Sequence, residues 1–230
     1  MSSNKNICRY CGKSFQRLST LSVHQCEQKR RWQQEKDPWV QFGLQAYLRF
    51  YEITQGSAKL KSYEDFVKSP YYSAFVKFGN YCYQIKCVNF RSFTEWLLKN
   101  NKKIDFWCKD KLYEEWLLEY IKKEAVQDAL ERALKEMQQY ADDHPELKNG
   151  FTDYFRYGNA NRVIHHICTG RVSPWIIFNC ESGVDFLGVL TEDQVALVMP
   201  WIDPAYWQQK FHDYLADTEW VKDVLHQANL

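Results

Sequence analysis

The sequence of 230 residues contains no long hydrophobic run. No segment approaches the roughly 18 consecutive apolar residues that a membrane-spanning helix needs. The amino terminus also lacks the basic-then-apolar pattern of a secretory signal. These absences argue against a membrane-spanning or exported class of protein. We therefore expect a cytoplasmic location and no membrane partner.

Glycine patterns for binding phosphates are missing as well. The nine glycines form neither a Walker-type loop nor a Gly-x-Gly pair, so the sequence shows no site for nucleotide hydrolysis. Carboxylate pairs such as Glu114-Glu115 and Asp142-Asp143 are typical of solvated helix faces. No nucleophile, base and orienting partner are recognisable together. We therefore expect the protein not to be an enzyme.

Strand-forming patterns are scarce, and the periodicity after Pro38 is helical almost everywhere. Residues 37–230 are therefore predicted to form an all-α globular body, with a possible further boundary near 142–150. A long helix from about Asp110 to Ala141 is expected to be its spine. Side chains that suit helix starts are Ser62, Ser92, Ser173, Thr191 and Asp203.

The eight cysteines fall into two groups. Three lie within the first 26 residues, and the other five are scattered among apolar residues without paired spacing: Cys82, Cys87, Cys108, Cys168 and Cys180. Scattered cysteines of this kind favour reduced, buried thiols over disulfides. A second metal site at Cys82 and Cys87 is the alternative, although no histidine lies near them in the sequence.

The amino-terminal cysteines and one histidine have the spacing of a metal site. Cys8 and Cys11 are separated by two residues, which suits a tight knuckle with both sulfurs on one metal. Twelve residues separate Cys11 from His24, enough for a returning strand and a short helix. Cys26 is the only local candidate for a fourth ligand, provided that the helix unwinds just after His24. We predict one tetrahedral Zn²⁺ ion on Cys8, Cys11, His24 and Cys26.

Two apolar residues between these ligands carry a family resemblance. With Phe15 four residues after the second cysteine and Leu21 three before the histidine, the segment resembles the zinc finger of the two-cysteine, two-histidine type. The resemblance implies a ββα-like finger, which we assign to residues 1–36 with a basic extension. The chain departs from the family at the fourth ligand, where Cys26 replaces a more distant residue. Coordination by three residues and an unseen partner, or a chance grouping of thiols, are the alternatives.

Charge favours nucleic acid as the partner of this module. Residues 1–36 carry eight cationic and two anionic side chains, a net charge of +6, although the whole chain is only +1. The resemblance places Arg17, Thr20 and Val23 at the base-facing helix positions, and DNA is expected more than RNA. The predicted nucleic-acid contacts are Arg9, Lys13, Arg17, Thr20, Lys29, Arg30 and Arg31. A finger that docks on protein, or merely caps the fold, is the alternative.

The basic extension continues into an aromatic residue. Lys29-Arg30-Arg31-Trp32 could lie along a phosphate strand with its indole stacked on a base, or form a solvated helix with one buried tryptophan.

The carboxy-terminal end has the opposite charge. Residues 172–230 hold two lysines against nine carboxylates, a net charge of −7. Such a segment suits docking on the finger or facing a basic protein partner, and ordinary solvated surface is the alternative.

One pattern in the body points to an enzyme. His165-His166 followed by Asn179 resembles the His-His, Asn, His order of a metal-dependent nuclease family. No histidine follows Asn179 at the expected eight or nine residues, and the first later one is His212. A nuclease is therefore the minor alternative.

As a whole, the chain resembles small zinc-finger proteins encoded by large tailed phages, which implies the host cytoplasm as its location. Residues between Ile167 and Trp175 also resemble phage helicase-loading proteins that bind forked DNA. We predict a zinc-dependent, nucleic-acid-binding accessory protein whose helical body recruits a replication, transcription or repair partner. A protein-interaction or virion-assembly adaptor with a structural finger is the alternative.

Overall fold

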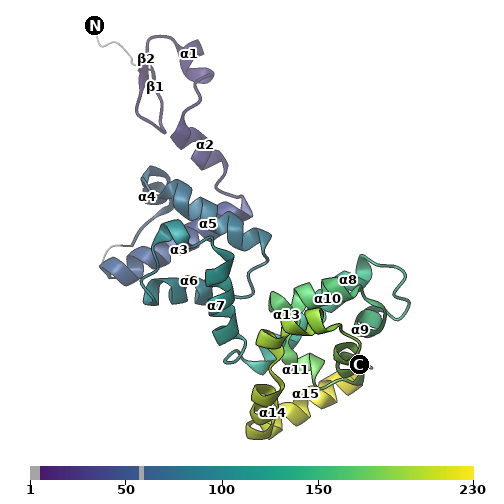
Figure 1. Ribbon diagram of the computed structural model, residues 1–230. Helices are drawn as coiled ribbons and strands as arrows, with labels where there is room; N and C mark the ends of the chain where they lie inside the picture. The colour runs from purple at the N-terminus through teal and green to yellow at the C-terminus, as the bar shows by residue number, and fades with distance from the viewer. Residues whose placement is uncertain (1–5, 57–59) are drawn as a thin grey trace. The chain divides into compact units, whose positions relative to one another are not determined.

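The computed structural model describes residues 6–56 and 60–230 and is mostly α-helical, with one small two-stranded sheet (Figure 1). This confirms the predicted fold class. The described residues pack as two compact units, 1–112 and 113–230. Lys5, which contributes to the predicted basic charge, lies outside the described residues.

The first unit begins with the sheet and continues as helices around one aromatic core. Its elements are β1 (Asn6–Ile7), β2 (Ser14–Phe15), α1 (Leu18–Ser22), α2 (Glu27–Gln33), α3 (Pro38–Gln55), α4 (Tyr63–Lys68), α5 (Tyr72–Gln84), α6 (Phe90–Lys99), the 3-10 turn η1 (Ile104–Phe106) and the start of α7 (Asp110–Tyr120).

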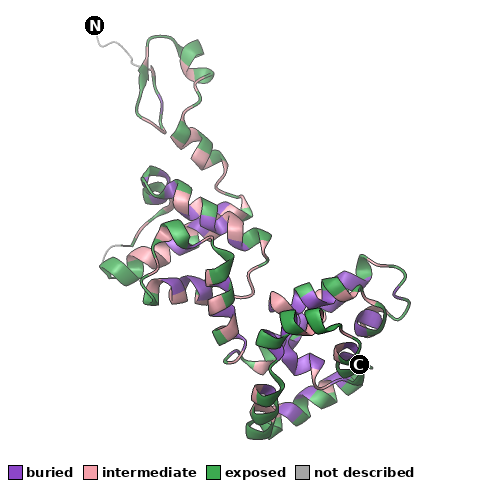
Figure 2. Ribbon diagram, in the orientation of Figure 1, coloured by how far each residue is buried: buried purple, intermediate pink, exposed green. Residues whose placement is uncertain are grey.

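Helices α3 and α5 form the main helix pair of this unit, and they approach closely at two glycines. A Cβ atom on Gly79 would lie 2.2 Å from the carbonyl oxygen of Trp39 and 2.5 Å from the nitrogen of Gly43. On the same helix, Phe75 and Phe78 pack against the indole of Trp107, with ring centroids 5.9 and 5.0 Å apart. The two glycines thus let the backbones approach beside an aromatic core. Figure 2 shows the buried positions along these helices.

The second unit holds the remainder of α7 and packs shorter helices around α8. Its further elements are α8 (Val126–Asp142), η2 (Gly150–Asp153), α9 (Tyr154–Tyr157), α10 (Ala160–Cys168), α11 (Pro174–Ile177), α12 (Glu181–Gly188), α13 (Glu192–Ile202), α14 (Pro204–Asp213) and α15 (Leu215–Gln227). Every residue of α11 is buried, and Ala129, Ala133 and Met137 bury one face of α8. These two helices contribute to one apolar interior.

The single long helix expected from Asp110 to Ala141 is wrong, because the chain breaks between α7 and α8. The carboxylate of Glu124 lies buried in the break and accepts two hydrogen bonds from Arg132, at 2.6 and 2.8 Å. Arg132 also donates to the carbonyl oxygen of Gly170 at 2.8 Å. Burial raises the pKa of Glu124, while the guanidinium opposes that shift. A polar pair of this kind has no signature in helical periodicity.

Most of the predicted helix starts are confirmed by capping hydrogen bonds. Ser62 and Thr191 each form a reciprocal capping box, and Ser173 and Asp203 accept backbone hydrogen bonds at the starts of α11 and α14. The prediction for Ser92 is wrong. Asn89 caps α6 instead, accepting a hydrogen bond from the Ser92 nitrogen at 3.0 Å. An asparagine is as good a cap as a serine, so the earlier residue starts the helix.

The boundary between the two compact units lies between residues 112 and 113. Residues 6–36 belong to the first unit, and 142–150 is a connection inside the second. The divisions expected at residue 36 and near 142–150 remain predictions about independent folding. In the described part of the chain, no helix combines the length and the apolar character needed to cross a bilayer.

We predict that Gly79→Ala destabilises the first unit by at least about 2 kcal/mol. Alanine favours helix by up to about 1 kcal/mol over glycine, but the new Cβ would clash with backbone atoms, which cannot rotate away. Urea denaturation followed by circular dichroism measures the change. Gly188→Ala is the matched control, because a Cβ there meets no atom within 4 Å. Equal urea midpoints for Gly79→Ala and Gly188→Ala would contradict the close approach of α3 and α5 at Gly79.

Candidate metal centre

The first two ligand candidates lie on a knuckle that closes the small sheet. Strands β1 and β2 pair antiparallel, with Asn6 opposite Phe15. The Cys8 nitrogen donates to the carbonyl oxygen of Lys13 at 2.9 Å, and the Gly12 nitrogen donates to that of Cys8 at 2.8 Å. Gly12 has a φ of +72°, a conformation that glycine adopts without a steric penalty. The turn therefore brings Cys11 back beside Cys8.

The other two ligand candidates follow the short helix α1. This helix ends at Ser22, so His24 and Cys26 both lie outside it. The helix was expected to unwind just after His24, and it ends two residues earlier. Cys26 has extended backbone angles and caps α2, where its sulfur accepts a hydrogen bond from the Lys29 nitrogen at 3.4 Å. The extended link turns both side chains toward the knuckle.

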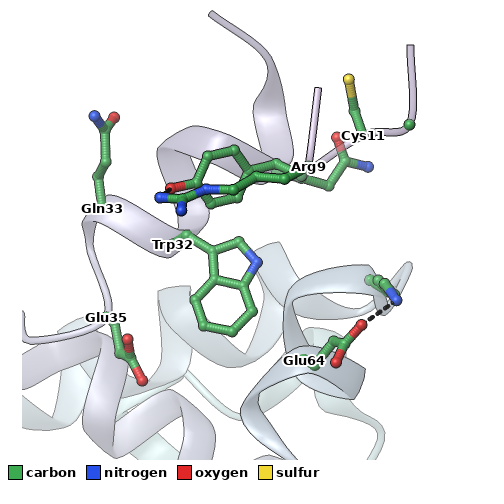
Figure 3. A pocket seen from close by; sticks show the side chains of 10 residues that line it. Arg9, Cys11, Trp32, Gln33, Glu35 and Glu64 are labelled. Carbon is green, nitrogen blue, oxygen red and sulfur yellow. Dashed lines mark hydrogen bonds and ion pairs between the residues drawn. The ribbon is translucent and has the colours of Figure 1, made fainter. Parts of the chain in front are cut away.

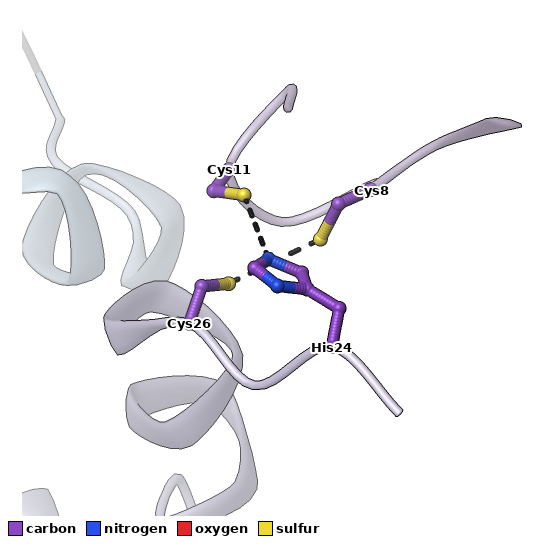
Figure 4. A group of neighbouring side chains, drawn as sticks. All are labelled: Cys8, Cys11, His24 and Cys26. Carbon is purple, nitrogen blue, oxygen red and sulfur yellow. Dashed lines mark hydrogen bonds between the residues drawn. The ribbon is translucent and has the colours of Figure 1, made fainter. Parts of the chain in front are cut away.

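The four side chains converge on one point (Figure 4). Their ligand atoms all lie within 4.8 Å of one another. The sulfurs of Cys8 and Cys26 are 4.0 Å apart, and the Cys11 sulfur is 3.4 Å from Nε2 of His24. In the described part of the chain, no other group of three or more Cys, His, Asp or Glu side chains meets this criterion. The group could hold a metal ion.

The electrostatics of the thiols differ across the site. The backbone N–H of Cys11 lowers the pKa of the Cys8 thiol, which favours the thiolate that binds metals. Burial raises the pKa of Cys26, and the hydrogen bond from the Lys29 nitrogen opposes that rise. A bound cation would favour the thiolate form at both positions.

Little packing supports this centre. The rings of Phe15 and His24 lie 4.6 Å apart, and the Lys29 ammonium donates to the His24 carbonyl oxygen at 3.2 Å. Phe15 and Leu21, the expected mini-core, are only half-buried. The ring contact positions the imidazole but leaves the module with a very small apolar interior.

Four of the predicted nucleic-acid contacts lie exposed on residues 6–26, the segment that carries the candidate metal centre and is called the metal module below. They are Arg9, Lys13, Arg17 and Thr20. Arg17 is the N-cap residue of α1, and Thr20 lies on that helix. Val23, the third base-facing position, is 75% exposed. The guanidinium of Arg9 lies over the Tyr10 ring, 4.7 Å from its centroid. These side chains are accessible to a partner.

The cationic side chains of the basic extension make more contacts within the protein than those of the metal module do. Arg30 forms an ion pair with Glu27, and Lys29 is half-buried against His24. Arg31 donates to the carbonyl oxygens of Val67 and Ser69, at 2.6 and 3.3 Å. Its nucleic-acid role stays a prediction.

Arg31 joins α2 to the region around α4. Besides its two carbonyl contacts, its guanidinium lies 4.4 Å from the centroid of the Tyr72 ring, and its side chain is only 15% exposed. The Tyr63 hydroxyl donates to the Arg31 carbonyl oxygen at 2.7 Å. No sequence signal distinguishes this arginine from the exposed cations beside it, so its structural contacts were missed.

The histidine pair singled out for a nuclease lies in a different setting. His166 is buried, with Nδ1 2.7 Å from the Tyr154 hydroxyl and Nε2 3.6 Å from the Glu136 carboxylate. His165 lies on the exposed side of the helix. Partial desolvation of its imidazole lowers its pKa, and the positive charge of nearby Arg171 lowers it further. The Asn179 amide donates to the carbonyl oxygen of Trp175 at 2.9 Å. The nuclease alternative stays a prediction, without a ligand cluster around this pair among the described residues.

Comparisons with known proteins add no assignment. No protein-family model matches the chain, and searches of curated proteins and of solved structures also return no match. The resemblances to the zinc finger and to phage proteins therefore remain interpretations of the residues.

We predict that Cys26→Ser weakens metal binding by roughly 100-fold or more. Loss of a partner that only hydrogen-bonds to a ligand costs 10–100-fold, so loss of a ligand costs at least as much. Competition titration against a chromophoric chelator measures the affinity, and elemental analysis gives the stoichiometry. Cys168→Ser, in the second unit, is the control and should bind as wild type does. Wild-type affinity in Cys26→Ser would favour coordination by three residues and an unseen partner.

Proposed function

We propose that the metal is Zn²⁺. Three sulfurs and one imidazole nitrogen form a ligand set that zinc prefers in closed structural sites. With zinc–sulfur bonds of about 2.3 Å, the sulfurs of a regular tetrahedron lie about 3.8 Å apart, and a sulfur and a nitrogen about 3.6 Å apart. The separations of 4.0 and 3.4 Å in this structure are close to both values. The ion would hold the knuckle against the segment from His24 to Cys26.

We further propose that the protein is a non-enzymatic, nucleic-acid-binding accessory protein, with DNA the preferred partner. The observation that carries the proposal is the charge of the metal module. Residues 6–26 contain three cationic side chains, Arg9, Lys13 and Arg17, and no carboxylate. All three are exposed. Three thiolates and one Zn²⁺ leave the site at −1, so the module keeps a net charge of +2 near phosphates.

The helical body supplies the second half of this proposal. It would recruit a replication, transcription or repair partner in the cytoplasm. If the chain is phage-encoded, this would be the cytoplasm of the phage host. Its acidic carboxy-terminal segment suits a basic partner surface.

We predict that changing Lys13 and Arg17 together to Ala removes most of the salt dependence of DNA binding. Each phosphate contact contributes about −0.9 to the slope of log affinity against log salt. Three contacts would weaken binding roughly 40-fold between 50 and 200 mM salt, and one remaining contact only about 3.5-fold. Fluorescence anisotropy with a labelled duplex at several salt concentrations measures the slope.

The matched control changes Lys103 and Lys111, two exposed lysines of the same unit, to Ala. This variant removes the same charge and should keep the wild-type slope. Two results would contradict a phosphate-binding role for the metal module. One is a wild-type DNA affinity that does not change with salt concentration, and the other is an equal salt slope in both double variants.

A protein-interaction or virion-assembly adaptor is the second candidate function. Apolar side chains of the second unit that are exposed to solvent favour it. Val189, Leu197 and Leu215 are 78%, 61% and 60% exposed. Exposed apolar residues in an acidic segment suit a partner with basic and apolar side chains.

For the adaptor we predict that Leu197→Asp abolishes capture of one defined partner from nuclease-treated extract. The new charge would have to be desolvated in an apolar interface. Co-purification followed by mass spectrometry detects the partner. The control is Leu18→Asp, which changes a leucine of similar exposure on the metal module and should retain the partner. Wild-type capture by Leu197→Asp would exclude this residue from the interface.

A further inference from the structure

A cleft of 890 Å³ lies beside the metal module, within the first unit. One wall is the knuckle, which contributes Arg9, Tyr10, Cys11 and Gly12. The other walls come from α2 with the turn after it, and from α4. Figure 3 shows the Trp32 indole below the side chain of Arg9, with Glu64 of α4 on another side. The volume is within the usual range for small-molecule sites.

Flat side chains and amides dominate the chemistry of this cleft. Tyr10 and Trp32 are both half-buried, so each leaves part of its ring accessible. The Arg9 guanidinium, itself planar, lies over the Tyr10 ring. The side-chain amides of Gln28 and Gln33 add donors and acceptors along the same cleft. Planar surfaces with amides at their edges suit a planar heterocycle that has its own hydrogen-bonding groups.

The charge balance of the lining distinguishes a base from a phosphate. Arg9 and Lys68 are cationic, whereas Glu35 and Glu64 are anionic, so these four charges cancel. Lys68 is already paired with the Glu64 carboxylate. The lining therefore offers a phosphate no net attraction, whereas an uncharged base needs none. Phosphates are better placed on the exposed face of the metal module, where Lys13 and Arg17 have no carboxylate within residues 6–26.

We propose that this cleft takes one unpaired base of single-stranded nucleic acid, stacked against Tyr10 and Trp32. The inference rests on the proposed nucleic-acid function, and it adds that the site selects single-stranded over double-stranded nucleic acid. A base in a duplex is already stacked and paired, so it must be extruded to enter the cleft. Single strands and forked ends therefore bind more tightly than duplex of the same sequence.

The test compares Tyr10→Ala and Trp32→Leu with wild type in the zinc-loaded, full-length protein. Anisotropy is measured with a fluorescein-labelled single strand and with its duplex. Each variant should weaken single-strand binding by roughly 5- to 150-fold, the range for removing one stacking partner. The affinity for duplex should stay within twofold of wild type. The slope of log affinity against log salt should not change. Tyr10→Phe keeps a ring and should bind as wild type does.

A second readout reports stacking directly. A single strand carrying 2-aminopurine should lose fluorescence on binding wild type, because a stacked base is quenched, and keep more of it with Trp32→Leu. Tyr71→Ala, which removes a tyrosine that is 53% exposed elsewhere in the unit, is the control. Metal stoichiometry and circular dichroism are measured for every variant. Since Trp32 also contacts Tyr63, Tyr10→Ala tests the cleft without altering the α2–α4 contact.

The outcomes separate this inference from the function on which it rests. If wild type binds DNA with a steep salt slope but both ring variants bind single strands normally, the cleft assignment is overturned and the proposed function stands. Equal losses for single strand and duplex also overturn it. If wild type binds neither probe, both proposals fail. Binding of a labelled arginine-rich decapeptide that is lost in Tyr10→Ala, with no effect on oligonucleotides, would assign the cleft to protein instead.

Discussion

Convergence of four side chains on one point is the constraint on which the amino-terminal structure depends. Among residues 6–26, only Cys8 is buried, and the apolar pair Phe15 and Leu21 remains half-exposed. A segment with so little buried surface cannot offset the entropy of ordering about twenty residues. The strands β1 and β2 contribute only two residues each. Coordination of a metal ion by Cys8, Cys11, His24 and Cys26 would supply the interaction that orders this segment.

Cys26 links the candidate metal centre to the rest of the first unit. Its side chain belongs to the ligand group, and the same residue caps α2. Helix α2 in turn is joined to the region around α4 through Arg31, which contacts two carbonyl oxygens there. The cleft lies between these parts, with Trp32 one residue beyond that arginine. Loss of the metal would thus remove one wall of the cleft as well as the knuckle.

Local chemistry explains what could be predicted from the sequence and what could not. The ligand group follows from spacing, and Ser62, Ser173 and Thr191 follow from capping rules, because these interactions join residues near in sequence. The break after α7 depends on the buried pair of Glu124 with Arg132, and the cleft depends on α4 meeting α2. Contacts of this kind join residues that no periodicity relates. The sequence indicates Trp32 as a candidate for base stacking and Arg9 as a nucleic-acid contact, but nothing in it indicates that they share a cleft with Tyr10 and Glu64.

The separation of charge from aromatic surface gives the two parts of the proposed site different tasks. Cations on the metal module would act on any phosphate backbone, so they would add affinity without selecting a sequence or a strand state. The cleft would add little long-range attraction, but it would discriminate between a free base and a paired one. Because Arg9 lies both on the exposed face and in the cleft wall, it connects the two. Under these two proposals, charge would concentrate the protein on nucleic acid, and the cleft would retain it where the strands are open, which is where a replication or repair partner would act.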